Sequence, residues 1–555
     1  MTDATNSGPV LAADGTPLKR SLNKALRVQK LRALALIAPL LIFVLLTFIA
    51  PIVDMLFRSV ENEIVQTTLP NTVTQLENWD ANSDEAPGEP VFEALYYDMF
   101  VAAEAKEHTK LGSRLNYEQT GISSLFRASG RSLDDIGEDY IKALETQNKD
   151  WKAADFWYAL MTGGEGATGN PAFLKEERRH LSALTGDSFS ADIGFVPGQD
   201  VSDLLPMTTS AYSQFALFTK VADGKEVAKK KPWEAVKIAL VQDLKAGADL
   251  SGYTGPGADE LKAAQTLLDD QPQIAFKEAF LELDKDWGKA DNWRTIQTYS
   301  PKYTSGYFLN AIDMQKGVDG AEARPENQQI YVKLFKRTLF MSLMIMGSCI
   351  LLGYPIAWLL ANLPTRTANL LMILVLLPFW TSLLVRTSAW KVMLQQQGVI
   401  NDVLVWLGMV GDADRLVMIN NQFGTIVAMT HILLPFMILP MYSVMQTIPP
   451  TYLRAAKSLG ATNWTAFWRV YFPQSVPGIG AGSILVFILA IGYYITPEIV
   501  GGTTGTFISN RIAYHISSSL NWGLGAALGT ILLVAVLILY WAYDKIVGID
   551  NVKLG

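Results

Sequence analysis

The residues whose types and spacing suggest a function most strongly lie in a polar, basic segment of about 28 residues, Tyr452 to Ile479, between two long apolar runs. This segment contains the adjacent alanines Ala455 and Ala456, then Gly460 and Pro473. Alanines keep the surface of a short helix low enough for close approach, and a glycine permits a turn that a side chain would obstruct. The pattern therefore predicts a rigid lever that seats in a groove of a soluble partner. The alternative is an ordinary amphipathic connector whose alanines and glycine arise by chance.

A second set of residues suggests cation binding. Asp54 and Glu498 are the only acidic residues that we place within an apolar run or at its outer end. A carboxylate within a membrane costs ~2–3 kcal/mol, so its presence there indicates a function. Aromatic faces also attract ammonium groups. The alternative is that Glu498 lies at the water boundary and the aromatic residues form an interfacial belt. The candidate substrate path comprises Asp54, Trp380, Trp390, Tyr493, Tyr494 and Glu498.

Catalytic chemistry is not indicated. The four histidines are scattered and form no H-x-x-x-H pair, and the single cysteine, Cys349, lies in an apolar run without a partner. We therefore predict no catalytic residues, no metal site and no enzyme activity in this chain. The sequence contains no G-x-x-x-x-G-K-[ST] phosphate loop, so any ATP is bound and hydrolysed by a partner chain. Basic patches with interleaved aromatic residues are absent outside the membrane flanks, so nucleic acid is not an expected partner.

Charge divides the chain into two parts. Residues 59–330 contain 26 Lys and Arg against 44 Asp and Glu, which gives a net charge of −18. The rest has 46 − 26 = 20 basic and 53 − 44 = 9 acidic residues, a net charge of +11. Half of all residues are apolar, which is too polar for an all-membrane protein and too apolar for a soluble one. An acidic domain is therefore inserted into a basic membrane protein.

Six apolar runs are long enough to cross a bilayer. The first, 33–58, follows a basic segment, residues 1–32, which we place in the cytoplasm because of its positive charges. The acidic domain, 59–330, then emerges outside the cytoplasm, and a second membrane part, 331–545, leads to a cytoplasmic tail, 546–555. Lys333, Lys336 and Arg337 oppose this topology. The expected later spans are about 338–361, 369–390, 423–446, 478–500 and 523–543, with chain breaks at Pro473 and Pro477.

The acidic domain is expected to be mostly helical. Ser132 is predicted to cap one helix, and further helices are expected over 91–110, 172–185, 226–248, 258–270 and 273–287. Residues 149–157, KDWKAADFW, resemble residues 285–293, KDWGKADNW, at an offset of 136 residues. A duplicated helical hairpin with two tryptophans in each core would explain this similarity. Chance similarity in a biased composition is the alternative.

The polar segment resembles the cytoplasmic EAA loop of bacterial ATP-binding-cassette importer permeases. Arg454-Ala455-Ala456-Lys457-Ser458-Leu459-Gly460 and Val470-Tyr471-Phe472-Pro473 match the family's alanines, glycine and proline at the expected spacing. Arg454 stands where the family usually has a glutamate. The resemblance implies that Arg454, Ala455, Ala456, Lys457, Gly460 and Pro473 contact the ATPase. We refer to residues 452–479 as the EAA-type loop.

Other stretches resemble the spermidine/putrescine branch of these permeases: Gly353-Tyr354-Pro355-Ile356-Ala357, residues 377–387 (LPFWTSLLVRT) and residues 496–502 (TPEIVGG). The resemblance covers less than half of the chain. It implies an all-α polytopic membrane protein with six transmembrane helices of the MetI-like permease fold, plus the mostly helical extracytoplasmic domain. It also implies a cytoplasmic ATP-binding subunit dimer, a second permease subunit and an extracytoplasmic solute-binding protein as partners in the bacterial inner membrane.

Two other classes of protein remain possible from the sequence. A membrane receptor with an extracytoplasmic ligand-binding domain explains the acidic domain, but no cytoplasmic segment exceeds ~35 residues, which leaves no room for an output domain of typical size. An extracytoplasmic enzyme has the least support, because no nucleophile motif stands out.

Overall fold

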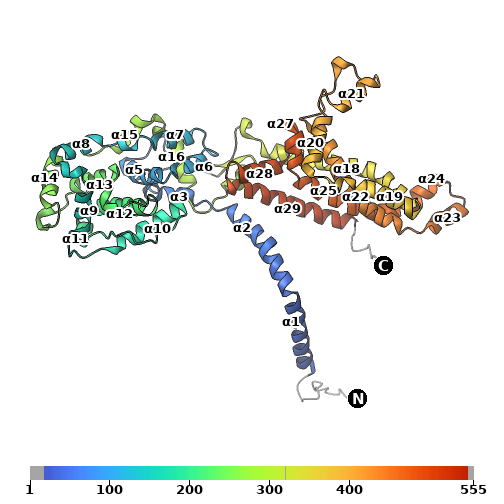
Figure 1. Ribbon diagram of the computed structural model, residues 1–555, viewed down its shortest axis with the longest axis horizontal. Helices are drawn as coiled ribbons and strands as arrows, with labels where there is room; N and C mark the ends of the chain where they lie inside the picture. Colours follow the sequence, from blue (N-terminus) through green and yellow to red (C-terminus); the bar gives the residue numbers. More distant parts are fainter. Residues whose placement is uncertain (1–17, 319, 548–555) are drawn as a thin grey trace, which may run out of the picture. The chain divides into compact units, whose positions relative to one another are not determined.

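The computed structural model describes residues 18–318 and 320–547. It divides into two compact units: a membrane unit, made by the described residues up to Val60 and from Lys333 onwards, and an insert, Glu61–Val332 (Figure 1). Most of the predicted basic segment 1–32 and of the predicted tail 546–555 lies outside the described residues, so both stay predictions.

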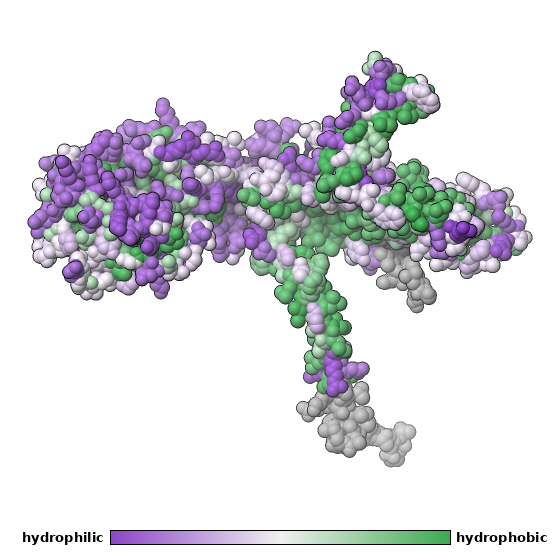
Figure 2. Space-filling view, in the orientation of Figure 1, coloured by the Kyte–Doolittle hydropathy of each residue, from purple (hydrophilic) through white to green (hydrophobic). Residues whose placement is uncertain are grey.

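The membrane unit contains five described helices long and apolar enough to cross a membrane, or six if one bent pair is a single span. Apolar side chains cover the first of them along much of its length (Figure 2). The spans, including the bent pair, are Leu26–Arg58, Tyr331–Asn362, Thr365–Trp380 with Leu383–Met393, Gln422–Gln446, Asn463–Gly492 and Trp522–Lys545. The predicted all-α fold with six apolar spans is confirmed.

Two predicted spans differ from the structure in their interior. The run 369–390 is not one straight helix, because its two parts are bent by 93° around Thr381 and Ser382. The run 478–500 is also interrupted: α25, Phe472–Gly492, ends before Tyr493, and the short α26, Ile495–Val500, follows. Both interruptions lie beside prolines, which remove a backbone donor and crowd the preceding turn.

The predicted breaks at Pro473 and Pro477 are wrong. The chain runs as one helical span from Asn463 to Gly492, and a π-helical turn, η10, Phe467–Tyr471, precedes Pro473. A π-turn shifts the hydrogen-bond register upstream of a proline, so the helix continues. Pro473 then occupies the first turn of α25, where its missing N–H is not needed.

The centre of the membrane unit is the contact between α22, Gln422–Gln446, and α25. A Cβ atom on Gly482 would lie 2.7 Å from the sulfur and 3.0 Å from the carbonyl oxygen of Met437. Close approach through small residues is a common way to join helices where lipid removes the hydrophobic driving force. This contact fixes the EAA-type loop at its base, because α22 leads into the loop and α25 leads out of it.

The insert is mostly helical, as predicted, with one small sheet in which β1, Met314–Lys316, pairs antiparallel with β2, Ala321–Ala323. Polar side chains cover much of its face in Figure 2. Its principal helices are α3 (Ile64–Thr68), α4 (Pro70–Leu76), α5 (Glu89–Glu104), α6 (His108–Leu115), α7 (Ile122–Ser129), α8 (Glu138–Gln147), α9 (Ala154–Thr162), α10 (Pro171–Thr185), α11 (Gln199–Leu204), α12 (Pro206–Val221), α13 (Glu234–Lys245), α14 (Ala258–Asp269), α15 (Phe276–Leu283), α16 (Ala290–Thr298) and α17 (Gly306–Ala311).

Several predicted helix bounds in the insert need correction. The helix expected after Ser132 is a short 3₁₀ turn, Leu133–Asp135, and α8 begins only at Glu138 after Gly137 in the left-handed conformation. The Ser132 side chain makes no capping hydrogen bond. The helix expected over 226–248 is shorter, because α13 begins at Glu234, two residues after Pro232. A proline removes a donor and disfavours helix in the residue before it.

The similarity at an offset of 136 residues is a structural repeat. The indole N–H of Trp157 donates to the carbonyl oxygen of Trp151 at 3.0 Å, and that of Trp293 donates to Trp287 at 2.7 Å. The ring centroids of the two pairs lie 5.4 and 5.2 Å apart. The side chains of Asn148 and Asp284 each accept a hydrogen bond from the backbone N–H two residues later, at 3.0 Å.

The repeat extends beyond the tryptophans. The Asp98 carboxylate accepts hydrogen bonds from the backbone N–H and the hydroxyl of Thr72, both at 2.7 Å. Asp243 accepts the same two bonds from Thr208, at 2.8 and 2.6 Å. Each aspartate is the tenth residue of its helix, α5 or α13, and each caps the helix that precedes it, α4 or α12. The first copy of the repeat therefore comprises α4, α5, α7, α8 and α9, and the second comprises α12, α13, α14, α15 and α16.

The two copies exchange their C-terminal parts. Phe92 on α5 of the first copy contacts Phe280 and Trp293 of the second, at ring centroid distances of 5.8 and 4.8 Å. Conversely, the ammonium of Lys237 on α13 lies 2.8 Å from the Glu145 carboxylate on α8. Figure 1 accordingly shows α8, α9 and α14 grouped at one end of the insert and α6, α7 and α16 at the other. Neither copy forms its own hydrophobic core.

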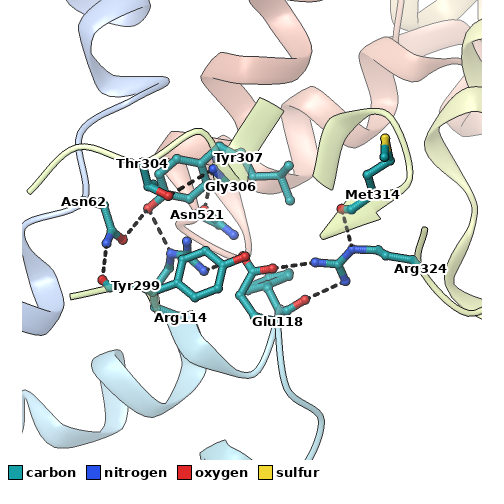
Figure 3. Close-up of polar contacts among 12 residues, drawn as sticks. Asn62, Arg114, Glu118, Tyr299, Thr304, Gly306, Tyr307, Met314, Arg324 and Asn521 are labelled. Carbon is teal, nitrogen blue, oxygen red and sulfur yellow. Dashed lines mark hydrogen bonds and ion pairs between the residues drawn. The ribbon is translucent and has the colours of Figure 1, made fainter. Parts of the chain in front are cut away.

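A buried ion network closes the insert where the chain enters and leaves it (Figure 3). The Glu118 carboxylate accepts from Arg114 at 2.8 Å and from Arg324 at 2.5 Å, and all three side chains are buried. Arg114 also donates to the Tyr307 hydroxyl at 2.9 Å. Removing one partner from such a network leaves an uncompensated buried charge, which costs about 3–5 kcal/mol. The network therefore holds α6 and α17 beside the β-hairpin.

Candidate functional site

The EAA-type loop begins with a short helix, α23, Pro450–Ser458, in which no residue is buried, although the helix contacts η10 on one side. Gly460 follows in the left-handed conformation, with φ of +90°, and a Cβ atom there would meet nothing within 4 Å. The glycine is therefore required by the backbone turn and not by packing. After the turn, the Thr462 side chain caps α24, Asn463–Ala466, which continues through η10 into α25.

The exposed side of α23 borders an open hollow of about 410 Å³. Arg454 and Lys457 are exposed, and among the described residues neither forms an ion pair. Leu459 is 89 % exposed at the edge of this hollow. The hollow is lined by Tyr452, Ala455, Ala456, Leu459, Val470 and Gln474.

Aromatic side chains hold the loop to the spans beneath it. The Tyr354 ring on α18, Tyr331–Asn362, contacts the rings of Phe467 and Phe472 at 6.2 and 5.8 Å between centroids. The Tyr354 hydroxyl lies 3.0 Å from the Ser475 hydroxyl. A force applied to α23 would therefore reach α18 and α25 through packed side chains, without a flexible linker.

The residues predicted for a substrate path do not form one cluster. The Asp54 carboxylate pairs with Arg58 at 2.8 Å on its own helix, and both side chains are exposed. Trp380 is 73 % exposed at the end of η8, Leu377–Trp380. Among the described residues, no hydrogen bond or ring contact joins either of them to Glu498, so their roles stay predictions.

The other predicted path residues have partners that the sequence did not identify. The Glu498 carboxylate accepts a hydrogen bond from the Asn510 amide at 2.6 Å, and the same amide donates to the Tyr494 carbonyl at 2.9 Å. Asn510 lies on α28, Ile508–Ser517, and fixes the interrupted chain around Tyr493 and Tyr494. The indole N–H of Trp390 donates to His431 Nδ1 at 3.1 Å. No spacing in the sequence relates Asn510 to Glu498 or His431 to Trp390.

Arg386 is a further residue that the sequence did not single out as a site residue. It lies on α20, Leu383–Met393, within the 377–387 stretch. Its Nε and Nη1 atoms are buried and have no hydrogen-bond partner among the described residues. Its presence in an apolar run is the signal that would have identified it, because a cation at such a position is costly.

The chain is similar to known transport proteins. Residues 353–547 match the family described as binding-protein-dependent transport system inner membrane component. The spermidine/putrescine transport system permease protein PotB of Escherichia coli (strain K12) is 34% identical over 222 residues, which cover 40% of this chain and 80% of that protein. PotB of Salmonella typhimurium (strain SL1344) is also 34% identical over 222 residues, covering 77% of that protein. A solved bacterial ABC transporter involved in the import of the acidic polysaccharide alginate matches with a TM-score of 0.33 and 21% identity, over 40% of this chain and 80% of that one.

Proposed function

Because this chain belongs to the family of binding-protein-dependent inner membrane transport components and is a permease subunit of an ABC importer, we propose that it imports putrescine, spermidine or a similar small solute. A cytoplasmic ATP-binding subunit dimer hydrolyses the ATP, and a second permease subunit completes the translocation path. A solute-binding protein delivers the cargo outside the cytoplasm. The relatives' printed names support the polyamine assignment.

The observation that carries the coupling role is the exposed helix α23 followed by the left-handed turn at Gly460. A permease without its own nucleotide site has to receive movement from the ATPase, and a rigid exposed helix at the end of two packed spans transmits it. The hollow beside Ala455 and Ala456 is the proposed contact with the ATPase groove. In this arrangement Arg454, in place of a glutamate, pairs with an acidic group of the ATPase.

The proposal also fixes the topology. With α23 in the cytoplasm, the two termini are cytoplasmic and the insert lies in the periplasm. The positive charges of Arg454, Lys457 and Arg469 in the EAA-type loop support this orientation. The relatives named above are transport proteins, so they do not favour the receptor alternative.

Site-directed cross-linking tests the coupling role. Cys349 is the only cysteine, so Cys349→Ala provides a cysteine-free background. Leu459→Cys should then cross-link to the ATP-binding subunit in membranes that contain the whole transporter, whereas Tyr303→Cys, an exposed position in the insert, should not. Absence of a Leu459→Cys product in an assembled transporter would remove the coupling role.

Uptake measurements test coupling and cargo together. Gly460→Val should lower polyamine uptake more than ~10-fold while the subunits still co-purify, because a β-branched residue strongly disfavours positive φ. Glu498→Gln should weaken uptake of a cationic substrate with assembly intact. Unchanged uptake kinetics in Glu498→Gln would remove Glu498 from the path.

A further inference from the structure

We propose that a cavity of about 480 Å³ in the insert is a binding site for a small linear diamine, with Glu93 and Tyr97 as its main contacts. The cavity is formed within the insert by α4, α5, α10 and α12. Its ligand belongs to the chemical class of the proposed cargo, so in that respect the inference builds on the proposed function. The geometry and charge that support it are independent of transport.

One face of each helix borders the cavity. Glu93 and Tyr97 lie one turn apart on α5, and Asn71 and Gln75 lie one turn apart on α4. On α12, Met207, Ser210, Ala211 and Gln214 follow the same helical spacing. The volume is in the range that holds small ligands.

Two polar groups on α5 have no partner in the described part of the chain. The Glu93 carboxylate makes no hydrogen bond and no ion pair there, although it is partly buried. The hydroxyl oxygen of Tyr97 is buried and also has no hydrogen-bond partner. Leaving the buried Tyr97 hydroxyl unpaired costs about 1–3 kcal/mol, so a ligand that pairs with it and with the Glu93 carboxylate is favoured.

The charge of the cavity fits a dication. Asp98 lines it as a buried carboxylate held by Thr72 and Asn71, and Glu177 lies behind it, accepting hydrogen bonds from Ser210 and Gln214 at 2.6 Å. His180 is the only lining side chain that can be cationic, because no lysine or arginine lines the cavity. Three carboxylates against one imidazole leave an excess of negative charge even when the imidazole is protonated.

A metal ion fits less well. Among the described residues, no group of three or more His, Cys, Asp or Glu side chains is placed to hold one. Ammonium groups bind both carboxylates and aromatic faces, and the cavity offers both on one helix.

The repeat shows that Glu93 and Tyr97 are not required by the fold. Counted from the first residue of each helix, Glu93 corresponds to Ile238 and Tyr97 to Gln242 on α13. Ile238 is fully buried in the hydrophobic core. The second copy thus folds with an apolar residue where the first copy keeps an unpaired carboxylate.

Calorimetric titration of the purified full-length chain in lipid nanodiscs, without other subunits, tests the inference. The probes are putrescine, 1,4-butanediol and succinate, which share a four-carbon chain but differ in charge. Putrescine should bind, and the other two should not. No putrescine binding, or a preference for succinate, would overturn the proposal.

Variants locate the bound putrescine. Glu93→Gln should weaken binding about tenfold and Tyr97→Phe a few-fold, because each removes one contact. Glu93→Ile, which copies the residue of the second repeat, should abolish binding while hydrogen exchange of α5 stays native. Glu278→Gln, an equal charge change on an exposed residue of α15, should leave binding unchanged. Putrescine binding that survives both Glu93 variants would contradict the assignment.

The same assay distinguishes the cavity in the insert from the substrate path predicted in the membrane unit. Loss of binding in Glu498→Gln with retention in Glu93→Gln would place the site in the membrane unit and overturn the inference. Uptake by the assembled transporter decides the proposed function independently, because a transporter that fails to import polyamines can still bind putrescine in the insert.

Discussion

Trp151 in the first copy of the repeat and Trp287 in the second occupy the same position, but only the Trp287 indole N–H has an acceptor. It donates to the Ser129 hydroxyl at 2.8 Å, whereas the Trp151 indole nitrogen is buried without a partner in the described residues. The aspartate caps, in contrast, are the same in both copies. The copies therefore retain the groups that terminate helices and differ in the groups around them.

The same contrast appears in the cavity, where the two copies contribute different residues at equivalent positions. α4 and α12 present equivalent faces to it, with Asn71 and Gln75 on α4 and Met207 and Ala211 on α12. The polar residues are all on the first copy at these positions. The two copies share the same helical framework. Residues that this framework does not need have diverged between the copies, and in the first copy they line the proposed binding cavity.

The largest effect is expected from removing Trp157 and Trp293, the second tryptophan of each copy of the repeat. Trp157→Ala and Trp293→Ala should each lower the local free energy of unfolding by about 3–5 kcal/mol, because both rings are fully buried. Hydrogen exchange measured by mass spectrometry on the full chain should show the effect in the other copy. Trp293→Ala should deprotect α5, which its ring contacts through Phe92, and Trp157→Ala should deprotect η4, Val227–Lys229, which lies between α12 and α13 of the second copy and contacts α9. Deprotection confined to the mutated copy would refute the exchanged packing.

Titration distinguishes the two capping aspartates. Burial raises the pKa of Asp98 to about 6, against the opposing effects of Thr72, Asn71 and His180. Burial opposes protonation of His180, but Glu177 and Asp98 raise its pKa overall. For both groups the folded state binds protons more tightly than the unfolded state, so stability is present at low pH and is lost as pH rises through the folded pKa.

We therefore expect the free energy of local unfolding of α4 and α5, measured by hydrogen exchange, to fall by about 2 kcal/mol between pH 4 and pH 7. Asp98→Asn should remove most of this slope. The pKa of Asp243 is also raised by burial, but no histidine acts on it. Asp243→Asn should therefore flatten the slope only around α12. An equal slope in the wild type and in Asp98→Asn would show that Asp98 does not titrate in this range.

A smaller effect is expected from giving Trp287 the surroundings that Trp151 has. Ser129→Ala leaves the Trp287 indole N–H without its acceptor, as Trp151 already is. We expect a loss of about 1–2 kcal/mol, measured as faster exchange of η6, Lys285–Gly288, and α15. Ser113→Ala, whose hydroxyl donates only to a carbonyl on its own helix at 2.8 Å, is the control and should change little. Equal effects of the two variants would mean that the Trp287 bond contributes nothing.

Sequence reasoning predicted the architecture because hydrophobic length and helical periodicity are local signals. The apolar runs, the left-handed glycine after α23 and the similarity of the two KDW segments were all readable from residues close together in the chain. The sequence did not predict the bend at Thr381, the continuation through Pro473 or the delayed start of α8. Each of these depends on which hydrogen-bond register the backbone adopts around a proline or glycine.

Long-range pairings were also beyond the sequence. Nothing local relates Asn510 to Glu498 or Arg324 to Glu118, and these residues lie 12 and 206 positions apart. The predicted repeat did not show that its two copies exchange their C-terminal parts, because a similarity between two segments does not say which copy each one packs against. The cavity could not be predicted for the same reason: its walls come from three helices of the first half of the insert and one from the second.

The smallest predicted effect concerns the caps of the two 3₁₀ turns, where Asn148 and Asp284 perform the same task with different chemistry. Each side chain accepts one backbone hydrogen bond at 3.0 Å, so Asn148→Ala and Asp284→Ala should each cost about 1 kcal/mol. The substitution Asn148→Asp should be neutral or stabilising by a few tenths of a kcal/mol, because a carboxylate at a helix N-terminus also interacts with the backbone dipoles. Asp284→Asn should cost the same small amount. Local exchange rates at low and high salt measure both, and the difference between amide and carboxylate should vanish at high salt, since the dipole interaction is screened and the hydrogen bond is not. A salt-independent difference would mean that Asn148 and Asp284 are held by unequal geometry, and that the two caps are equivalent only in distance.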